Sequence, residues 1–441
     1  MRDLLITAIV LGSLPLIMKR PYIGVLMWSW IGYMNPHRLA YGFANEFPFA
    51  KIVGAVTIAA LLFSREEKSI SWSREIVLLV CFNVWMTVTT VFAMNPVEAW
   101  PQWEKVIKIQ LMVFITLMLI RDRDKLESLI WVIVVSLGYY GVKGGLFSIL
   151  TGGQHLIWGP DGSFIAGNNE IGLALTMTLP LMRYLQLTTQ NQRVSKGLIG
   201  AQALMAVAII ATYSRGALLA VSAMGFFLWM KAKNKALLGM VFLLALPILF
   251  AFMPDKWFAR METIQTYEQD RSAQGRINAW TFAYNLAADR PILGGGFEVF
   301  SRDIFLQTNY APDPTNFHDA HSIYFEVLGE QGYVGLLLFL SIGILTWSKA
   351  SHIMAQTAKD PDLQWAKELA SMLQVSLVGY AVGGAFLGLG YFDLYYHLVA
   401  MTVVLARLVE TKGRQHQSNL GVDFGGPLKP SYGIPVQASR W

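Results

Sequence analysis

The sequence predicts an all-α protein that crosses a membrane about twelve times. Hydrophobic residues make up 54% of the 441 residues and charged residues only 15%, whereas a typical soluble domain carries about 25% charged residues. Apolar runs long enough to span a bilayer recur along the whole chain, and most segments between them are short. These observations predict a polytopic transmembrane helical protein with one long extramembrane loop that contains helices of its own.

Thirteen apolar segments are candidate membrane spans. They cover residues 4–18, 22–36, 50–64, 76–93, 106–120, 126–149, 169–187, 197–212, 216–231, 236–253, 333–349, 368–389 and 393–408. The first two are short, and only residues 19–21 separate them. They could therefore form one broken element, and we expect about twelve true crossings.

Lysine and arginine residues predict which side of the membrane each loop faces. The cation-rich segments are residues 121–125, 193–196, 231–235 and 407–414. They fall on one side if the spans between them are right, and that side should be the cytoplasm, together with the C-terminus. The opposite, outer side then receives residues 37–49, 94–105, 151–168, 213–215 and 254–332, and the turn near residue 390.

The chain divides into four parts by this scheme. Residues 1–253 carry the first nine or ten spans, residues 254–332 form the long outer loop, residues 333–408 carry the last spans, and residues 409–441 form a cytoplasmic tail. The long loop contains six Lys or Arg residues against eleven Asp or Glu residues, and a loop of this length in a compact protein is usually functional. The tail is polar and rich in Gly and Pro, which predicts disorder.

Composition and motifs argue against several classes of function. The net charge of +6 is explained by cations in cytoplasmic loops, so we expect no nucleic acid as a partner. The single cysteine, Cys81, lies inside an apolar run, which excludes an intramolecular disulfide and a thiolate metal cluster. The glycine run at residues 294–296 is not a phosphate-binding loop for nucleotides, because no Lys-Ser or Lys-Thr pair follows it.

The strongest candidate for a reaction site is residues 315–333, where two histidines and several carboxylates lie against a span. Ionisable groups beside a bilayer are costly and usually functional. His321 is the candidate catalytic base, because imidazole takes up a proton near neutral pH, and His318 and Glu330 could support it. Two other interpretations stay open: a histidine that only bonds a loop carbonyl, and a metal site of His318, Asp319 and His321 that lacks a third His or a Cys.

The local structure around His321 also follows from the pattern. If residues 319–330 are helical, His321 shares one helix face with Tyr324, Phe325 and Leu328.

Three arginines on the predicted outer side are candidate ligands for a diphosphate. Arg215 lies in a turn between two apolar runs, and Arg276 and Arg290 lie in the long loop. A guanidinium half-buried at a membrane surface needs an anion, and its planar fork suits phosphate or carboxylate. Arg215 could instead extend to lipid headgroups, and Arg290 could form a surface ion pair with Asp289.

Three further polar residues could take part on the same side. Asn168 and Asn169 come at the start of a span, where they could cap the helix or bond a sugar or phosphate. Lys143 lies near the outer end of its span and could either extend to the membrane surface or join the anion site.

These motifs, in this order, resemble those of the O-antigen ligase and polymerase superfamily. The histidine motif comprises His321, Ser322, Leu328, Glu330, Gly332, Gly335 and Leu336. The other matching landmarks are the Ser-Arg-Gly turn at residues 214–216, Gly275 with Arg276 and Trp280, Pro291 with Gly294, and Gly167 with Asn168. The resemblance covers roughly residues 150–340 and is weak at the N-terminus.

The resemblance implies a glycosyltransferase of the bacterial inner membrane whose active site faces the periplasm. Its donor would be a glycan on undecaprenyl diphosphate, its acceptor a hydroxyl of lipid A–core oligosaccharide, and it would need no metal, nucleotide or other cofactor. His321 would deprotonate the acceptor hydroxyl, the arginines would stabilise the leaving diphosphate, and a single displacement would invert the anomeric centre. The acceptor could instead be a protein or a growing polymer, and a transporter of lipid-linked glycans is the alternative from another class.

Overall fold

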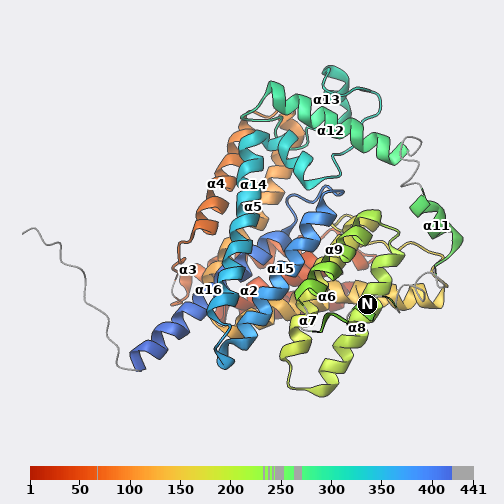
Figure 1. The fold of residues 1–441 in the computed structure, drawn as a ribbon. Helices are drawn as coiled ribbons and strands as arrows, with labels where there is room; N and C mark the ends of the chain where they lie inside the picture. Colours follow the sequence, from red (N-terminus) through yellow and green to blue (C-terminus); the bar gives the residue numbers. More distant parts are fainter. Residues whose placement is uncertain are drawn as a thin grey trace, which may run out of the picture.

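The computed structural model describes residues 1–66, 68–231, 234–236, 239–240, 243, 253–262 and 271–419, and the regular elements in these ranges are all helical (Figure 1). The α-helices are α1 (Arg2–Lys19), α2 (Tyr22–Met34), α3 (Phe49–Phe63), α4 (Arg74–Val91), α5 (Pro96–Leu119), α6 (Arg123–Leu150), α7 (Asn168–Thr188), α8 (Gln192–Ala211), α9 (Arg215–Lys231), α11 (Asp255–Glu262), α12 (Arg271–Asp289), α13 (Arg302–Gln307), α14 (Ile323–Gln356), α15 (Gln364–Gly384) and α16 (Asp393–Asn419). Short 3-10 turns are η1 (Pro36–Leu39), η2 (Phe43–Asn45) and η3 (Pro361–Leu363).

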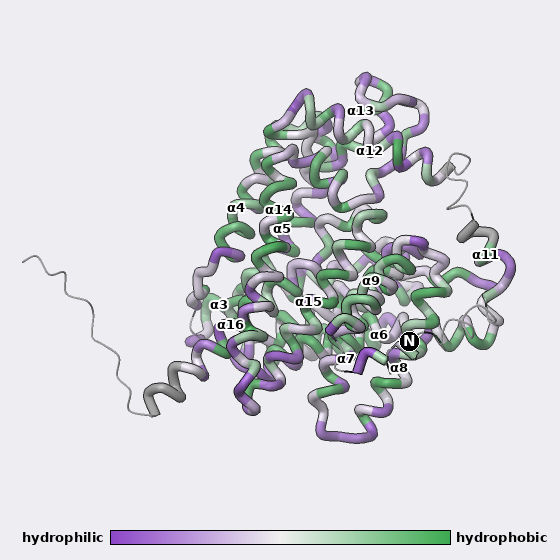
Figure 2. Tube along the Cα trace, in the orientation of Figure 1, coloured by the Kyte–Doolittle hydropathy of each residue, from purple (hydrophilic) through white to green (hydrophobic). Residues whose placement is uncertain are grey.

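Each predicted span that lies within the described residues corresponds to a helix; most of residues 236–253 lies outside them. Among the described helices, α4, α6, α8, α14 and α16 are both long enough and apolar enough to cross a membrane. The helices α2, α3 and α9 have 13, 15 and 17 residues, which is shorter than the ~20 residues of a typical span. Figure 2 shows hydrophobic residues along the length of α4 and α14, and hydrophilic ones gathered near α12 and α13.

The centre of the bundle is α7, which packs against α6, α8, α9 and α15. Its side chains are buried along most of its length, although Thr176 and Thr178 are polar. Each of these hydroxyls donates to the backbone carbonyl four residues earlier, Gly172 and Ala174 respectively. A threonine can therefore be buried in this helix without an unsatisfied hydroxyl.

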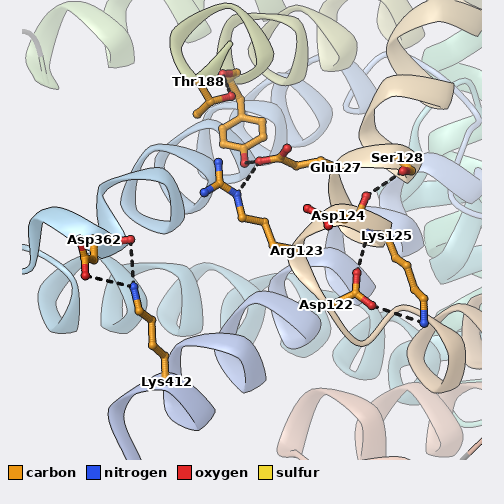
Figure 3. Close-up of polar contacts among 10 residues, drawn as sticks. Asp122, Arg123, Asp124, Lys125, Glu127, Ser128, Thr188, Asp362 and Lys412 are labelled. Atoms are coloured by element: carbon orange, nitrogen blue, oxygen red, sulfur yellow. Dashed lines mark hydrogen bonds and ion pairs between the residues drawn. The ribbon is translucent and has the colours of Figure 1, made fainter. Parts of the chain in front are cut away.

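One end of the bundle carries several of the predicted cytoplasmic cations (Figure 3). Arg123 donates from Nε to Glu127 Oε1 at 2.7 Å, and the hydroxyl of Tyr184 donates to the same carboxylate oxygen at 3.0 Å. Lys412 of α16 lies 3.7 Å from the carboxylate of Asp362. The start of α6, the end of α7 and the end of α16 therefore lie at the same end, as the positions of the cations in the sequence predict.

Two predicted boundaries are wrong. The tail was expected to be disordered from residue 409, but α16 continues to Asn419; residues 420–441 lie outside the described residues. The helix that follows the histidines begins at Ile323 rather than near residue 319. His321 has a φ of +43°, which is not helical, so it cannot share a helix face with Tyr324, Phe325 and Leu328.

The first turns of α14 are separated from its long apolar part by a kink at Gly332, which has φ 67° and ψ −172°. The loop after α12 is docked on this kink by backbone hydrogen bonds: Gly295 N donates to Gly329 O, Gly296 N to Glu330 O, and Tyr333 N to Pro291 O, at 2.8, 2.8 and 2.9 Å. The glycine run and the kinked helix are therefore joined by backbone hydrogen bonds next to the start of α14, which follows the histidine segment.

Candidate active site

The segment that carries the histidines, residues 313–322, is held along α12 by two side chains. Asn278 donates from Nδ2 to the carbonyls of Asp313 and Asn316, both at 2.8 Å, and its Oδ1 accepts from Asp313 N at 2.9 Å. The indole nitrogen of Trp280 donates to Ala320 O at 2.7 Å. Because Ala320 directly precedes His321, these bonds fix the backbone on which His321 is carried.

His318 and His321 lie close to the start of α12. A Cβ at Gly275 would lie 2.3 Å from Cδ2 of His318, so the imidazole packs directly on the glycine backbone. Arg276 follows Gly275 and is close enough to influence the charge state of His321. The sequence prediction that these two histidines and Arg276 share a side of the protein therefore agrees with their positions.

Burial is the main cause that lowers the pKa of His321 below its ordinary value of 6.5. Asp319 opposes this shift, whereas the positive charge of Arg276, and to a smaller extent the neighbouring His318, lower the pKa further. The imidazole is consequently neutral at pH 7, which is the protonation state that a general base requires.

A cavity of about 400 Å³ lies on the other side of Asp319. It is lined by one cation, Lys105, by the carboxylates Glu170, Glu298, Asp319, Glu326 and Glu330, and by Gln102, Ser163, Phe164, Phe300, Gly388, Leu389 and Tyr391. We call it the carboxylate cavity. Burial, and then the nearby Asp319, raise the pKa of Glu298, and Lys105 opposes that shift. The cavity is suited to sugar hydroxyls, because a carboxyl group accepts hydrogen bonds when ionised and both donates and accepts them when protonated.

Two of these carboxylates tie separate segments to α14. Glu330 accepts from the backbone N–H of Glu298 at 3.0 Å and from the hydroxyl of Tyr391 at 2.6 Å. Glu326 accepts from Gly390 N at 2.8 Å. Both oxygens of Glu330 are thus occupied by structural bonds, so its support for the site consists of holding the cavity wall.

The turn that carries Arg215 is also built by defined contacts. Tyr213 has a φ of +56°, and its hydroxyl donates to Gly153 O at 2.7 Å. Asn168 donates from Nδ2 to Thr212 O at 2.8 Å, and Gly167, not an asparagine, is the N-cap of α7. The expected capping role of Asn168 is therefore wrong; its side chain joins the second outer loop to the arginine turn, and Asn169 follows it half-buried.

Arg290 lies beyond the opposite end of α12 from the histidines. Arg290 follows the end of α12, and at 1.5 Å per residue it is about 20 Å along the helix from Arg276. Its guanidinium donates to the Phe92 carbonyl at 2.8 Å. Lys143 is exposed on α6, with its Nζ 5.8 Å from the ring centroid of Tyr139. Arg276 and Arg290 therefore lie too far apart for both to contact one diphosphate, and the pairing of Arg215 with one of them stays a prediction.

Three residues that no sequence motif indicates, Lys105, Glu170 and Glu298, are brought to the site by the fold. Glu170 follows the Asn168–Asn169 pair and lines the carboxylate cavity together with Lys105 and Glu298. Glu298 has a φ of +57°, and nothing in its surroundings in the sequence indicates that it turns inward. Within the described part of the chain, no group of three or more His, Cys, Asp or Glu side chains is arranged to hold a metal ion.

Two family models match the chain. Residues 1–190 match a family described as a family of unknown function, DUF5935. Residues 200–340, which include Arg215, α12, the histidine segment and the kink in α14, match a family described as O-Antigen ligase. No curated protein matches the chain significantly.

Proposed function

Because the chain belongs to the O-antigen ligase superfamily, we propose that it transfers a glycan from undecaprenyl diphosphate to a hydroxyl of lipid A–core oligosaccharide. The observation that carries this proposal is the position of His321. Its charge state is influenced by a cation, Arg276, and by Asp319, and Asp319 lines a cavity whose carboxyl groups can hydrogen-bond sugars. A base close to both a cation for the diphosphate and a sugar site is the arrangement that such a transfer requires.

The reaction is a single displacement at the anomeric carbon of the donor. The neutral imidazole of His321 takes the proton of the acceptor hydroxyl as its oxygen forms the new bond to the anomeric carbon. The bond from that carbon to the diphosphate oxygen breaks, and its electron pair leaves with undecaprenyl diphosphate. Attack from the face opposite the leaving group inverts the anomeric centre.

In this mechanism Arg276 and Arg215 stabilise the leaving diphosphate. Arg276 is the nearer candidate, because its charge acts directly on His321. Arg215 begins α9 at the same end of the bundle as the second outer loop. Negative charge that develops on the bridging oxygen is stabilised most strongly by cations already fixed in place. The leaving group is therefore expected to need no general acid.

The proposed setting is the bacterial inner membrane, crossed about twelve times. The end of the bundle with α12 and the histidine segment would face the periplasm, and the end with Arg123 and Lys412 the cytoplasm, together with the C-terminus. The support for this orientation is the gathering of cations at the second end (Figure 3).

The function is tested by offering acceptors one at a time to the purified full-length protein with one glycan on undecaprenyl diphosphate. We expect a new glycosidic bond with lipid A–core, and little product with a pilin-like protein or with a second lipid-linked repeat. Product with the pilin-like protein alone would instead assign a protein-glycosylating ligase. Product with the second lipid-linked repeat alone would assign a polymerase. Glycan movement across vesicles with no new bond would overturn the transferase assignment.

The pH dependence of transfer gives a test with a defined sign. The active form of His321 is neutral, so activity should fall on the acid side with a midpoint below 6.5, the ordinary pKa of histidine. Asp319→Asn removes a charge that raises this pKa, so the acid limb should move to lower pH. Arg276→Gln removes a charge that lowers it, so the limb should move to higher pH.

Profiles of kcat/KM against pH measure these shifts, and Asp161→Asn, a change at an exposed loop carboxylate, is the matched control. Shifts of the same sign in both variants would contradict the assignment of the acid limb to His321.

A further inference from the structure

A second large cavity lies in the N-terminal part of the chain, within the region that matches a family of unknown function. Its volume is about 760 Å³, and α2, α3 and α5 form its walls. Its lining includes the apolar side chains Trp28, Ile58 and Met112 and the cations Lys51, Lys105 and Lys108. We call it the N-terminal groove.

The charges and the apolar residues of the groove occupy different depths. Along α3, Lys51 comes first and Ile58 two turns later; along α5, Lys105 precedes Leu111 and Met112. The helix α2 runs the opposite way, with Trp28 before the loop that carries Arg38. The cations therefore lie toward the end of the bundle that carries the histidine segment, and the apolar lining lies deeper.

The groove carries more positive than negative charge. Arg38, Lys51, Lys105 and Lys108 line it, against the two carboxylates of Glu104 and Asp393. Glu104 forms an ion pair with Lys108, and Arg38 donates to Asn45 Oδ1 at 3.1 Å. An apolar slot with surplus cations at its mouth matches an amphiphile with an anionic headgroup.

The N-terminal groove adjoins the carboxylate cavity. Lys105, Ser163 and Phe164 line both spaces, and Lys105 Nζ lies 3.7 Å from the ring centroid of Phe164. The lining of the carboxylate cavity also includes Asp319, which acts on the charge state of His321. A molecule anchored in the groove would therefore have its polar part directed toward the candidate base.

We propose that the N-terminal groove binds the phosphorylated lipid anchor of the acceptor. Acyl chains lie against Trp28, Ile58 and Met112, a phosphate lies between Lys51 and Lys108, and the sugars extend through the carboxylate cavity to His321. This inference rests on the proposed glycan transfer and assigns the anchor site of its acceptor.

The lining of the carboxylate cavity indicates whether the groove binds the lipid of the donor or the lipid of the acceptor. The donor diphosphate must lie beside the anomeric carbon, and hence close to His321. Between the groove and His321, the lining of the carboxylate cavity holds one cation, Lys105, and five carboxyl groups. It therefore offers little positive charge to a diphosphate, whereas carboxyl groups hydrogen-bond sugar hydroxyls whether they are ionised or protonated. Uncharged sugars, rather than a diphosphate, therefore fit between groove and base.

The experiment measures lipid binding to the full-length protein by native mass spectrometry, without donor and without turnover. The probes are diphosphorylated lipid A and undecaprenyl diphosphate, each added alone. Lys51→Gln/Lys108→Gln removes two headgroup contacts, and Ala55→Trp fills the slot without a change of charge. Ala55 and Lys51 are exposed in the groove, and Lys108 is half-buried with an ion pair to Glu104, so none of these changes removes a side chain from the buried apolar core.

We expect both variants to bind lipid A about tenfold more weakly and undecaprenyl diphosphate as the wild type does. The matched controls, Lys196→Gln/Lys359→Gln and Leu4→Trp, change exposed residues outside the groove and should bind both lipids normally. If Ala55→Trp fails to fold, the lysine pair alone decides. Unchanged lipid A binding in that pair, or a loss confined to undecaprenyl diphosphate, would overturn the proposal.

The two proposals fail separately. His321→Ala should retain wild-type binding of lipid A, because His321 does not line the groove. If the wild-type protein transfers no glycan but the groove variants lose lipid A, the site stands and the reaction is wrong. If transfer occurs and the variants bind lipid A normally, the reaction stands and the site is wrong.

Discussion

Replacement of His321 by alanine is expected to lower the rate of glycan transfer by about 10²–10⁴-fold, the usual contribution of a positioned general base. The imidazole is neutral at pH 7 because burial lowers its pKa, and the bond from Trp280 to Ala320 fixes its backbone. Alanine removes the proton acceptor and leaves these backbone contacts in place. Turnover of a lipid-linked glycan in detergent measures the effect.

His318→Ala is the matched control for this prediction. His318 lies three residues before His321 and packs on Gly275. Loss of its imidazole should alter this packing and raise the pKa of His321 slightly. The effect on turnover should be much smaller than that of His321→Ala. Donor binding should be retained in both variants. Full activity in His321→Ala, or an equal loss in His318→Ala, would be inconsistent with His321 as the base.

Gly332→Ala is expected to destabilise the protein by about 3 kcal/mol or more. Gly332 has φ 67° and ψ −172°, a region of backbone conformation that is essentially restricted to glycine. A Cβ there would lie 2.3 Å from the Ile292 carbonyl oxygen. The backbone itself would have to move, and the bond from Tyr333 N to Pro291 O would be strained. Large destabilisation from a single methyl group is expected where both conformation and space forbid it.

Thermal unfolding in detergent measures this loss, and Gly200→Ala in α8 is its control. A Cβ at Gly200 meets no atom within 4 Å, so alanine there should be neutral or slightly stabilising, since it favours a helix. A melting temperature for Gly332→Ala equal to that of Gly200→Ala would show that the kink is dispensable.

The helices and their grouping at two ends could be predicted from the sequence, because apolar length and cation position are local properties of the chain. Arg123 lies 4.6 Å from the ring centroid of Trp365, and Lys412 pairs with the nearby Asp362, so the two cations lie at one end, as the sequence predicts. The start of α14 could not be predicted, since the positive φ of His321 depends on the contacts that Asn278 and Trp280 make across the loop.

The site was predictable only in part, for a related reason. His321 and Arg276 lie in the same predicted outer loop, so the sequence indicates that they face the same side. In the structure the segment between them folds back along α12. Arg290 shares the same loop but lies beyond the far end of α12, where it binds Phe92 O. Lys105 and Glu298 reach the carboxylate cavity from distant parts of the chain, and no local pattern in the sequence indicates that convergence.

The most direct test of the account is an experimental structure of the protein with undecaprenyl diphosphate bound. We expect the diphosphate oxygens within hydrogen-bond distance of the Arg276 guanidinium, with the imidazole of His321 facing the oxygen that carries the glycan. A diphosphate bound instead between Lys51 and Lys108, with no contact to Arg276, would contradict both the catalytic site and the assignment of the groove to the acceptor.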